Sequence, residues 1–313
     1  MNNLGKILGY YENGNYVVSV FNNGEKIRNS KDNHFLPTTI ESLTIKITNK
    51  CGGIDIIGNE SKSYSNVSCK YCSEGSSPFG KHGDITSKSF LDLLHPYCEV
   101  NIDGGNPLQH PQLYDFLSLC KERKHIVNIT LNQRHFIYDY EMVKDLCNKR
   151  LVWGLNVSLV EVDDDLIEKI KHIPNATIQV INGIVTNEQL TQLKDNNLRL
   201  KVLGYKEIRR GQKLYEKAST FIEQRKTMLK ELLPNIISEK WFYTLSLDEL
   251  AKEQIYGNND EVTQDIVFNN ASLYVDMVER KFAKNDLSPI EERFDILDNV
   301  EEMFTFLQKR ETN

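Results

Sequence analysis

Three of the six cysteines in this chain are spaced so that they could bind a metal centre together. Cys51 stands alone, whereas Cys69 and Cys72 form a C-x-x-C pair around Tyr71, after a stretch rich in Gly, Ser and Asn. Three thiolates on one loop can hold three irons of a [4Fe–4S] cluster and leave the fourth iron open. A closed zinc site is the alternative, with His82 or a more distant cysteine as its fourth ligand.

The other three cysteines, Cys98, Cys120 and Cys147, lie in apolar surroundings, where a free cysteine is usually a packing residue. Six cysteines in 313 residues are too few for a disulfide scaffold, so we expect thiols in a reducing compartment. These three form no compact cysteine-rich block, and we therefore expect no second cluster.

A second candidate element is the run Gly104-Gly105-Asn106-Pro107, which ends a predicted strand over 98–103. Two glycines after a strand mark a sharp turn or a place where the backbone must approach another group closely. An ordinary turn between a strand and a helix is the alternative interpretation.

Polar side chains also end the later predicted strands, at Thr130–Gln133, Asn156–Ser158 and Val180–Gly183. In α/β barrels the active site usually lies where such strand ends meet. A hydrogen bond that merely terminates a strand explains these residues equally well.

A basic cluster follows the last of these strands and could bind a phosphate or carboxylate group. It consists of Lys201, Tyr205, Lys206, Arg209 and Arg210. A solvated loop is the more common explanation of such a cluster. His82, His110 and His135 fall near the same strand ends, but lone histidines are weak evidence for acid–base chemistry.

Alternating strands and helices must position these residues. Apolar–polar alternation and short apolar runs predict strands over 42–48, 98–103, 126–132, 151–159, 177–182 and 198–203. Helices are predicted between them over 87–94, from Pro111, over 140–149 and after Asp163. Repeated strand–helix units imply parallel strands joined by right-handed crossovers, and hence an α/β barrel or an open sheet.

Two flanking regions differ from this alternation. Residues 4–29 predict a small antiparallel sheet, because Asn-Gly turns at 12–15 and 22–25 separate alternating apolar runs. We expect this sheet to be a structural cap or an interaction module. We therefore divide the chain into an N-terminal β module (1–37), a core (38–215) and a mostly helical C-terminal extension (216–313).

The C-terminal extension is predicted from three signals. A helix over 217–233 carries a stripe of Phe221, Met228, Leu229 and Leu232 and is expected to stop at Pro234. Residues 241–247 could form another strand. Ser288–Glu291 has the pattern of a capping box and predicts the start of the last helix.

The cysteine and glycine motifs together resemble the radical S-adenosylmethionine (radical SAM) superfamily, and most closely a phage-encoded branch with no assigned substrate. The resemblance rests on Ile47–Cys51, Cys69–Asp84 and Asp103–Pro111, and it spans most of the chain, loosely after residue 215. The superfamily signature is C-x3-C-x2-C, whereas seventeen residues separate Cys51 from Cys69 here. Certain 7-carboxy-7-deazaguanine synthases in the superfamily also have an enlarged first spacing and bind the cluster.

The resemblance implies a partial (β/α)6 TIM-type barrel and a [4Fe–4S] cluster on Cys51, Cys69 and Cys72. It implies that Gly104, Gly105, Asn106 and Pro107 match the superfamily's Gly-Gly-Glu-Pro motif, which contacts the methionyl amino group of SAM. Asn106 replaces the glutamate, and an amide accepts a hydrogen bond without charge assistance. Other candidate SAM-binding residues at the strand ends are Asn132, Ser158, which would contact the ribose or carboxylate, and Ile181, which lies near the adenine.

The activity implied is reductive cleavage of SAM to methionine and a 5′-deoxyadenosyl radical, which abstracts hydrogen from a substrate. A flavodoxin- or ferredoxin-like protein would donate the electron, and a nucleobase, a nucleotide or a peptide would be the substrate. The alternative is a non-catalytic barrel that binds a cluster or zinc and serves as a structural or regulatory interaction protein.

The composition limits the partners. The net charge is −6 and the isoelectric point about 5.7, so there is no overall attraction to nucleic acid or an anionic membrane, although a local basic patch is compatible. No apolar run approaches the length of a membrane span, and the first residues lack the apolar core of a signal peptide. We expect a cytoplasmic protein, in the host cytoplasm if phage-encoded.

Overall fold

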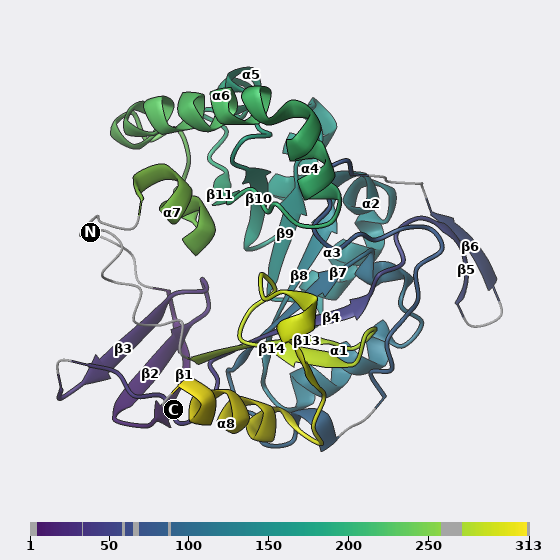
Figure 1. The fold of residues 1–313 in the computed structure, drawn as a ribbon, viewed down its shortest axis with the longest axis vertical. Helices are drawn as coiled ribbons and strands as arrows, with labels where there is room; N and C mark the ends of the chain where they lie inside the picture. Colours follow the sequence, from purple (N-terminus) through teal and green to yellow (C-terminus); the bar gives the residue numbers. More distant parts are fainter. Residues whose placement is uncertain are drawn as a thin grey trace.

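A mostly parallel ten-stranded sheet organises the molecule (Figure 1). The computed structural model describes residues 5–32, 34–57, 60–64, 69–86, 89–257 and 271–311. The sheet order is β12-β11-β10-β9-β8-β7-β4-β13-β14-β15. Their bounds are β4 Ser42–Thr48, β7 Glu99–Gly104, β8 Ile126–Asn132, β9 Gly154–Ser158, β10 Ala176–Ile181, β11 Arg199–Leu203, β12 Thr244–Leu247, β13 Ser272–Asp276, β14 Lys281–Ala283 and β15 Phe294–Asp295.

The eight strands from β12 to β13 run parallel, and only β14 and β15 are antiparallel to their neighbours. The α/β class is therefore confirmed, together with all six predicted core strands. In the described residues the strand order is that of an open sheet, and its curvature into a partial barrel stays a prediction.

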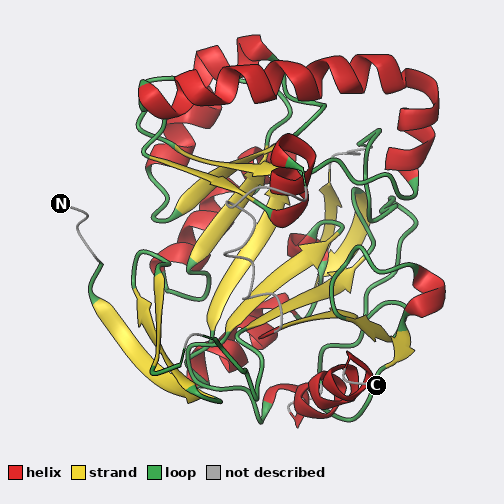
Figure 2. Ribbon diagram, turned by 60° about the vertical axis from the view of Figure 1, so that its left-hand side comes forward, coloured by secondary structure: helices red, strands yellow, loops and turns green. Residues whose placement is uncertain are grey.

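The two faces of the sheet differ in polarity because its strands alternate. One face buries aliphatic side chains such as Ile45, Ile102, Ile129, Val157 and Val202, each no more than 1% exposed. Helices lie around this sheet (Figure 2); for example, α1 contacts β8 and α4 contacts β10. The helices are α1 Leu113–Glu122, α2 Gln133–Tyr138, α3 Tyr140–Asn148, α4 Asp164–Lys171, α5 Asn187–Leu193, α6 Arg210–Ser238, α7 Glu249–Tyr256 and α8 Val300–Glu311. None in the described part of the chain is long and apolar enough to cross a membrane.

The predicted N-terminal antiparallel sheet is confirmed, with β1 (Ile7–Asn13), β2 (Tyr16–Phe21) and β3 (Lys26–Ser30) in that order. Its apolar face, which includes Tyr16 and Val18, packs on Ile126 and Trp153 at the amino ends of β8 and β9. The small sheet therefore covers the amino-terminal edge of the large one.

Buried charge ties this small sheet to the core. Arg28 on β3 donates two hydrogen bonds, from Nε at 3.0 Å and Nη2 at 2.6 Å, to the Oε2 of Glu41. The hydroxyl of Tyr16 donates to the other carboxylate oxygen at 2.6 Å. Glu41 is only 3% exposed, so its charge depends on these partners.

Four local predictions are wrong. The helix predicted over 87–94 is reduced, in its described part, to a 3₁₀ turn at Ser89–Leu91. Helix α6 continues through Pro234 to Ser238, because Leu233 and Ile236 on either side are both buried. The stripe of this helix does not include Phe221, which is 51% exposed.

The predicted capping box at Ser288 does not begin the last helix: only a 3₁₀ turn, Ile290–Glu292, follows it, and α8 begins at Val300. The Asn285 side chain instead accepts hydrogen bonds from the backbone of Leu287 and Ser288 and forms a turn. Phe294 then pairs with Phe282 in the sheet, and both rings pack against Phe306 of α8.

Helices predominate after residue 216, but this part also supplies β12 to β15. The possible strand at 241–247 is present as β12, and β13 pairs with β4 at the centre of the sheet. The division of the chain at residues 37 and 215 stays a prediction.

We expect Arg28→Met to lower the free energy of unfolding by about 3 kcal/mol, because it leaves the buried Glu41 carboxylate without its cation. Urea denaturation measures this change. The double variant Arg28→Met/Glu41→Gln removes the charge that was left behind and should recover part of the loss. Equal stability of wild type and Arg28→Met would show that the pair does not hold the small sheet.

Candidate active site

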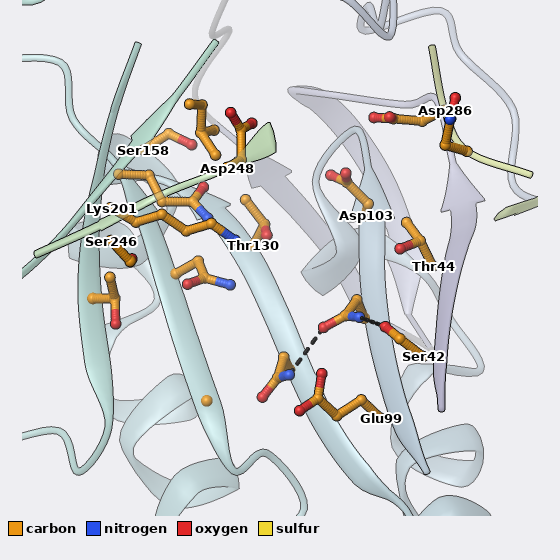
Figure 3. Close-up of a pocket in the computed structure, with 18 of the residues that line it drawn as sticks. Ser42, Thr44, Glu99, Asp103, Thr130, Ser158, Lys201, Ser246, Asp248 and Asp286 are labelled. Atoms are coloured by element: carbon orange, nitrogen blue, oxygen red, sulfur yellow. Dashed lines mark hydrogen bonds between the residues drawn. The ribbon is translucent and has the colours of Figure 1, made fainter. Parts of the chain in front are cut away.

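A cavity of about 860 Å³ lies over the polar face of the large sheet. Inward-facing residues of successive strands line it, and Figure 3 shows several of them from both walls, including Thr44, Asp103, Thr130, Ser158 and Lys201. At the carboxyl ends of the strands it reaches the candidate metal ligands. At the amino ends it reaches the β2–β3 turn of the small sheet.

All three candidate cysteine ligands line this cavity and are free thiols. Cys51 follows the end of β4. Much of the seventeen-residue separation forms a hairpin of β5 (Gly53–Ile57) and β6 (Glu60–Tyr64), which projects to one side in Figure 1. Gly53 pairs with Tyr64 across this hairpin. The extra residues therefore form a hairpin whose two ends lie next to each other.

The Gly-Gly motif holds the segment that carries Cys51. The Gly105 amide donates to the Thr48 carbonyl oxygen at 2.8 Å, and the Asn106 amide to that of Lys50 at 2.7 Å. A β-carbon on Gly105 would lie 2.0 Å from the Lys50 oxygen, and one on Gly104, whose φ is +119°, would lie 2.1 Å from that of Thr48. The close backbone approach expected of this motif is therefore an approach to the Cys51 segment.

Gln109, which no sequence motif singled out, makes a further contact with the segment that carries Cys51. Its Oε1 accepts from the Gly52 amide at 2.8 Å, and its Nε2 donates to the Gly52 carbonyl oxygen at 3.1 Å. The side chain is fully buried. The Gln109 amide thus bonds both backbone groups of Gly52, as the backbone of a neighbouring strand would. No sequence signal distinguishes such a buried glutamine from one on the surface.

Two nitrogens from the β8–α2 junction lie beside the thiols. Asn132 Nδ2 donates to Cys69 Sγ at 3.5 Å, while its Oδ1 caps α2. His135 Nε2 lies 3.4 Å from Cys51 Sγ. Burial lowers the pKa of His135 to about 4, so its ring is neutral at pH 7. Since Nδ1 has no partner in the described residues, we assign the hydrogen to Nε2, where it can bond the sulfur.

The surroundings disfavour free thiolates. Burial raises the pKa of Cys51 to about 12, with further contributions from Cys69 and Cys72, although Arg210 opposes the shift. Burial and Cys72 also raise the pKa of Cys69. Both groups are therefore thiols at neutral pH unless a cation binds among them, and binding such a cation would release their protons.

A charged network borders the same cavity. Lys46 is 1% exposed and forms ion pairs with Glu74 at 3.0 Å and Asp276 at 3.1 Å. Burial and Glu74 raise the pKa of Asp103 to about 6, although Lys206 opposes the shift. Buried charges of this kind persist only when they are paired, so the network links the loop after Cys72 to β4 and β13.

Most of the predicted SAM-binding positions line the cavity: Gly104, Gly105, Asn132, Ser158 and Ile181. Asn106 and Pro107 are buried and are absent from its lining. The Oδ1 of Asn106 accepts from the Leu108 amide at 3.2 Å and caps a short 3₁₀ turn, Pro107–Gln109. Its Oδ1 therefore has a structural contact, whereas its buried Nδ2 has no hydrogen-bond partner in the described residues.

The predicted basic cluster is not one anion site, because most of its members have structural partners. Lys206 pairs with Asp286, and Arg209 and Arg210 donate to the backbone carbonyls of Glu74 and Ser76. The Tyr205 hydroxyl donates to the Gly211 carbonyl. Tyr205, Lys206 and Arg210 line the cavity, as does Lys201, but Lys201 forms no hydrogen bond or ion pair within the described part of the chain.

The alternative zinc ligand His82 is bonded through Nδ1 to the Thr48 hydroxyl at 2.9 Å, and its ring packs on His110. Within the described ranges, no group of three or more Cys, His, Asp or Glu side chains is gathered closely enough to hold a metal ion. The three cysteines thus share one end of the cavity without forming a closed ligand set.

We expect Gln109→Leu to lower the free energy of unfolding by about 2–4 kcal/mol, because it leaves the Gly52 amide and carbonyl without partners. Chemical denaturation of the purified protein measures the loss. Gln192→Leu, at an exposed position of α5, should change stability by less than about 0.5 kcal/mol. If both variants lost equal stability, the contact with Gly52 would not be responsible.

Comparison with known proteins finds no matching family model and no matching curated protein. Crystal structures of SuiB from Streptococcus suis do match. One aligns with a TM-score of 0.57 at 12% identity, over 93% of this chain and 84% of SuiB. The structure of SuiB bound to S-adenosylmethionine gives 0.54 and 14%, and the structure bound to the precursor peptide SuiA gives 0.52 and 13%.

These alignments cover 86% and 80% of this chain but only 64% and 61% of the two SuiB complexes. The chain thus spans less than two thirds of the SuiB chain in each complex. At such identities the likeness concerns the fold. The fold of this protein is similar to that of SuiB.

Proposed function

We propose that this protein is a radical SAM enzyme whose [4Fe–4S] cluster is held by Cys51, Cys69 and Cys72. One observation carries the proposal: three free thiols line the same large cavity, at the carboxyl edge of a parallel sheet. The similarity in fold to SuiB, which has been crystallised with S-adenosylmethionine, supports it.

The donor set suits such a cluster. Three thiols without a fourth described ligand leave one iron free for a small molecule, whereas a structural zinc site is closed by four protein ligands. Because burial raises the pKa of Cys51, binding of the cluster would displace the proton of this thiol. When bound, the cluster would supply the electron that cleaves SAM to methionine and a 5′-deoxyadenosyl radical, which takes hydrogen from the substrate.

The remaining residues would position SAM and keep water away from it. The backbone at Gly104 and Gly105, together with Asn132, Ser158 and Ile181, lines the part of the cavity next to the thiols. Asn106 would act indirectly, since its side chain caps the turn behind the motif. Bound SAM would thus rest mainly on main-chain groups and on hydroxyl and amide side chains.

The proposal includes a soluble flavodoxin- or ferredoxin-like electron donor and a peptide, nucleobase or nucleotide as substrate. The structure of SuiB with a precursor peptide is consistent with the peptide alternative. Assignment to a phage-encoded branch and to the cytoplasm belongs to the same proposal.

A second candidate is a barrel that binds a cluster, zinc or SAM and performs no radical chemistry. Asn106 favours it, because its Oδ1 caps Leu108 and the residue is not part of the cavity lining. The cleavage products of SAM distinguish the two functions.

The decisive experiment is anaerobic reconstitution with iron and sulfide, followed by SAM and dithionite. We expect 5′-deoxyadenosine to form with wild type and to fall to background with Cys69→Ala, because the cluster loses one of its three protein ligands. Chromatography with mass detection measures the product. Cys120→Ala removes a buried thiol on α1 instead, and it should retain both cluster and product.

Uptake of zinc without iron or sulfide would contradict the cluster. A cluster whose SAM remains intact under dithionite would favour the non-catalytic alternative.

The nitrogens beside the thiols should tune the cluster. Asn132→Asp keeps the cap on α2 but removes the N–H that reaches Cys69, and His135→Phe removes the N–H that reaches Cys51. Each should make the reduction potential more negative, since hydrogen bonds to the sulfurs stabilise the reduced cluster. A redox titration followed by electron paramagnetic resonance measures the potential.

Asn128→Asp is the matched control, because Asn128 lies on the same strand, lines the same cavity and donates to Asn101 instead of a thiol. A shift as large as that of Asn132→Asp would attribute the effect to the added charge alone.

A further inference from the structure

The two walls of the cavity differ in how their polar side chains are satisfied. On the wall formed by β4, β7 and the start of β8, Asn101 donates to the Ser42 hydroxyl at 2.8 Å, and Asn128 donates to Asn101 at 2.9 Å (Figure 3). Glu99 at the same level pairs with Lys26 at 3.2 Å. At this level the wall is internally bonded, which gives these side chains a structural role.

The opposite wall has polar side chains without partners. Ser158, Gln179, Lys201 and Ser246 occupy one row across β9, β10, β11 and β12, because each is in register with the next. All four line the cavity. Gln179 is only 5% exposed, and its Oε1 has no hydrogen-bond partner in the described residues. A buried acceptor without a partner costs free energy and indicates a missing donor.

Lys201 is the charged member of this row. Its side chain extends into the cavity (Figure 3), and the described part of the chain provides it with no ion pair or hydrogen bond. Other cations in the lining are engaged: Arg199 with the Asn23 carbonyl and Lys206 with Asp286. An ammonium group on a cavity wall attracts an anion as a point charge.

No carboxylate in the described part of the chain forms an ion pair with Lys201. Asp286 pairs with Lys206, and Glu74 pairs with Lys46. Asp248 caps α7 by accepting from Ala251 at 2.7 Å and also accepts from Gly204 at 2.9 Å. The row thus combines one cation, one unsatisfied acceptor and one hydroxyl beside Ser158, the residue next to which SAM is proposed to lie.

We propose that Gln179, Lys201 and Ser246 bind the anionic end of a small polar substrate, with Lys201 as the counter-charge of a carboxylate or phosphate. The inference rests on the proposed function, because a substrate must contact SAM for hydrogen transfer and this row adjoins Ser158. Gln179 would accept from an N–H or O–H of the same molecule. The β2–β3 turn lines the far end of the cavity, which suits a compact ligand.

The test uses reconstituted protein and two matched pairs of probes. Uridine 5′-monophosphate is compared with uridine, and N-acetylglycine with N-acetylglycinamide, by isothermal titration calorimetry. We expect the charged member of at least one pair to bind at least tenfold more tightly than its neutral partner. Lys201→Met should abolish this preference, while Lys230→Met, at an exposed position of α6, should preserve it. The two pairs distinguish a phosphate from a carboxylate.

Titration with SAM separates the sources of the anion and checks folding. If Lys201→Met binds SAM as tightly as wild type, Lys201 binds the anionic group of the substrate. A selective loss of SAM affinity would instead show that Lys201 binds the SAM carboxylate, and it would overturn the inference. Equal affinity for charged and neutral probes in wild type, or a preference that survives in Lys201→Met, also overturns it. Failure of the cluster to form is a separate result, visible in the absorption spectrum, and contradicts the proposed function instead.

Discussion

The close contact between two backbone segments at the carboxyl end of β4 positions the first candidate ligand. The Gly105 and Asn106 amides bond the carbonyls of Thr48 and Lys50, and a β-carbon at 104 or 105 would collide with those carbonyls. Only glycine permits this approach without rearrangement. Gln109 extends the contact to Gly52. Main-chain groups and one buried amide therefore fix the chain next to Cys51, and such rigid support is what a catalytic site requires.

Ion pairs connect the rest of the site to the segment that carries Cys51. Lys46 lies in the middle of the buried sheet, yet its partners are Glu74, in the loop after Cys72, and Asp276, at the end of β13. Lys206 likewise reaches Asp286, beyond β14. Because unpaired buried charges are costly, these contacts require the C-terminal strands to be in place when the cysteine loop is ordered. The residues after 216 thus belong to the site as well as to the extension.

The parts that local patterns predicted are those where one interaction dominates. The strands at 42–48 and 126–132 have the predicted bounds, since their alternation matches one buried and one cavity-facing side. Elsewhere tertiary packing outweighed the local sequence signals. Helix α6 continues through Pro234 because Leu233 and Ile236 are buried, and Phe294 lies in the sheet because it pairs with Phe282. The Gly52 contact of Gln109 joins residues 57 positions apart, and no local pattern encodes such a partner. The three candidate cysteines, Gly104, Gly105 and Ser158 do line the cavity, as their places at strand ends and the resemblance led us to expect, and their roles stay predictions.

The long interval between Cys51 and Cys69 becomes compatible with one site once the hairpin is considered. In an antiparallel pair, opposite residues lie roughly 5 Å apart, so the pairing of Gly53 with Tyr64 returns the chain close to where it left. The backbone hydrogen bonds within the hairpin then offset much of the entropic cost of closing this loop. The number of residues between two cysteines reflects the distance between them only when the intervening chain is extended. What a cluster needs is three thiols near one point, and an insertion with paired ends leaves that condition unchanged.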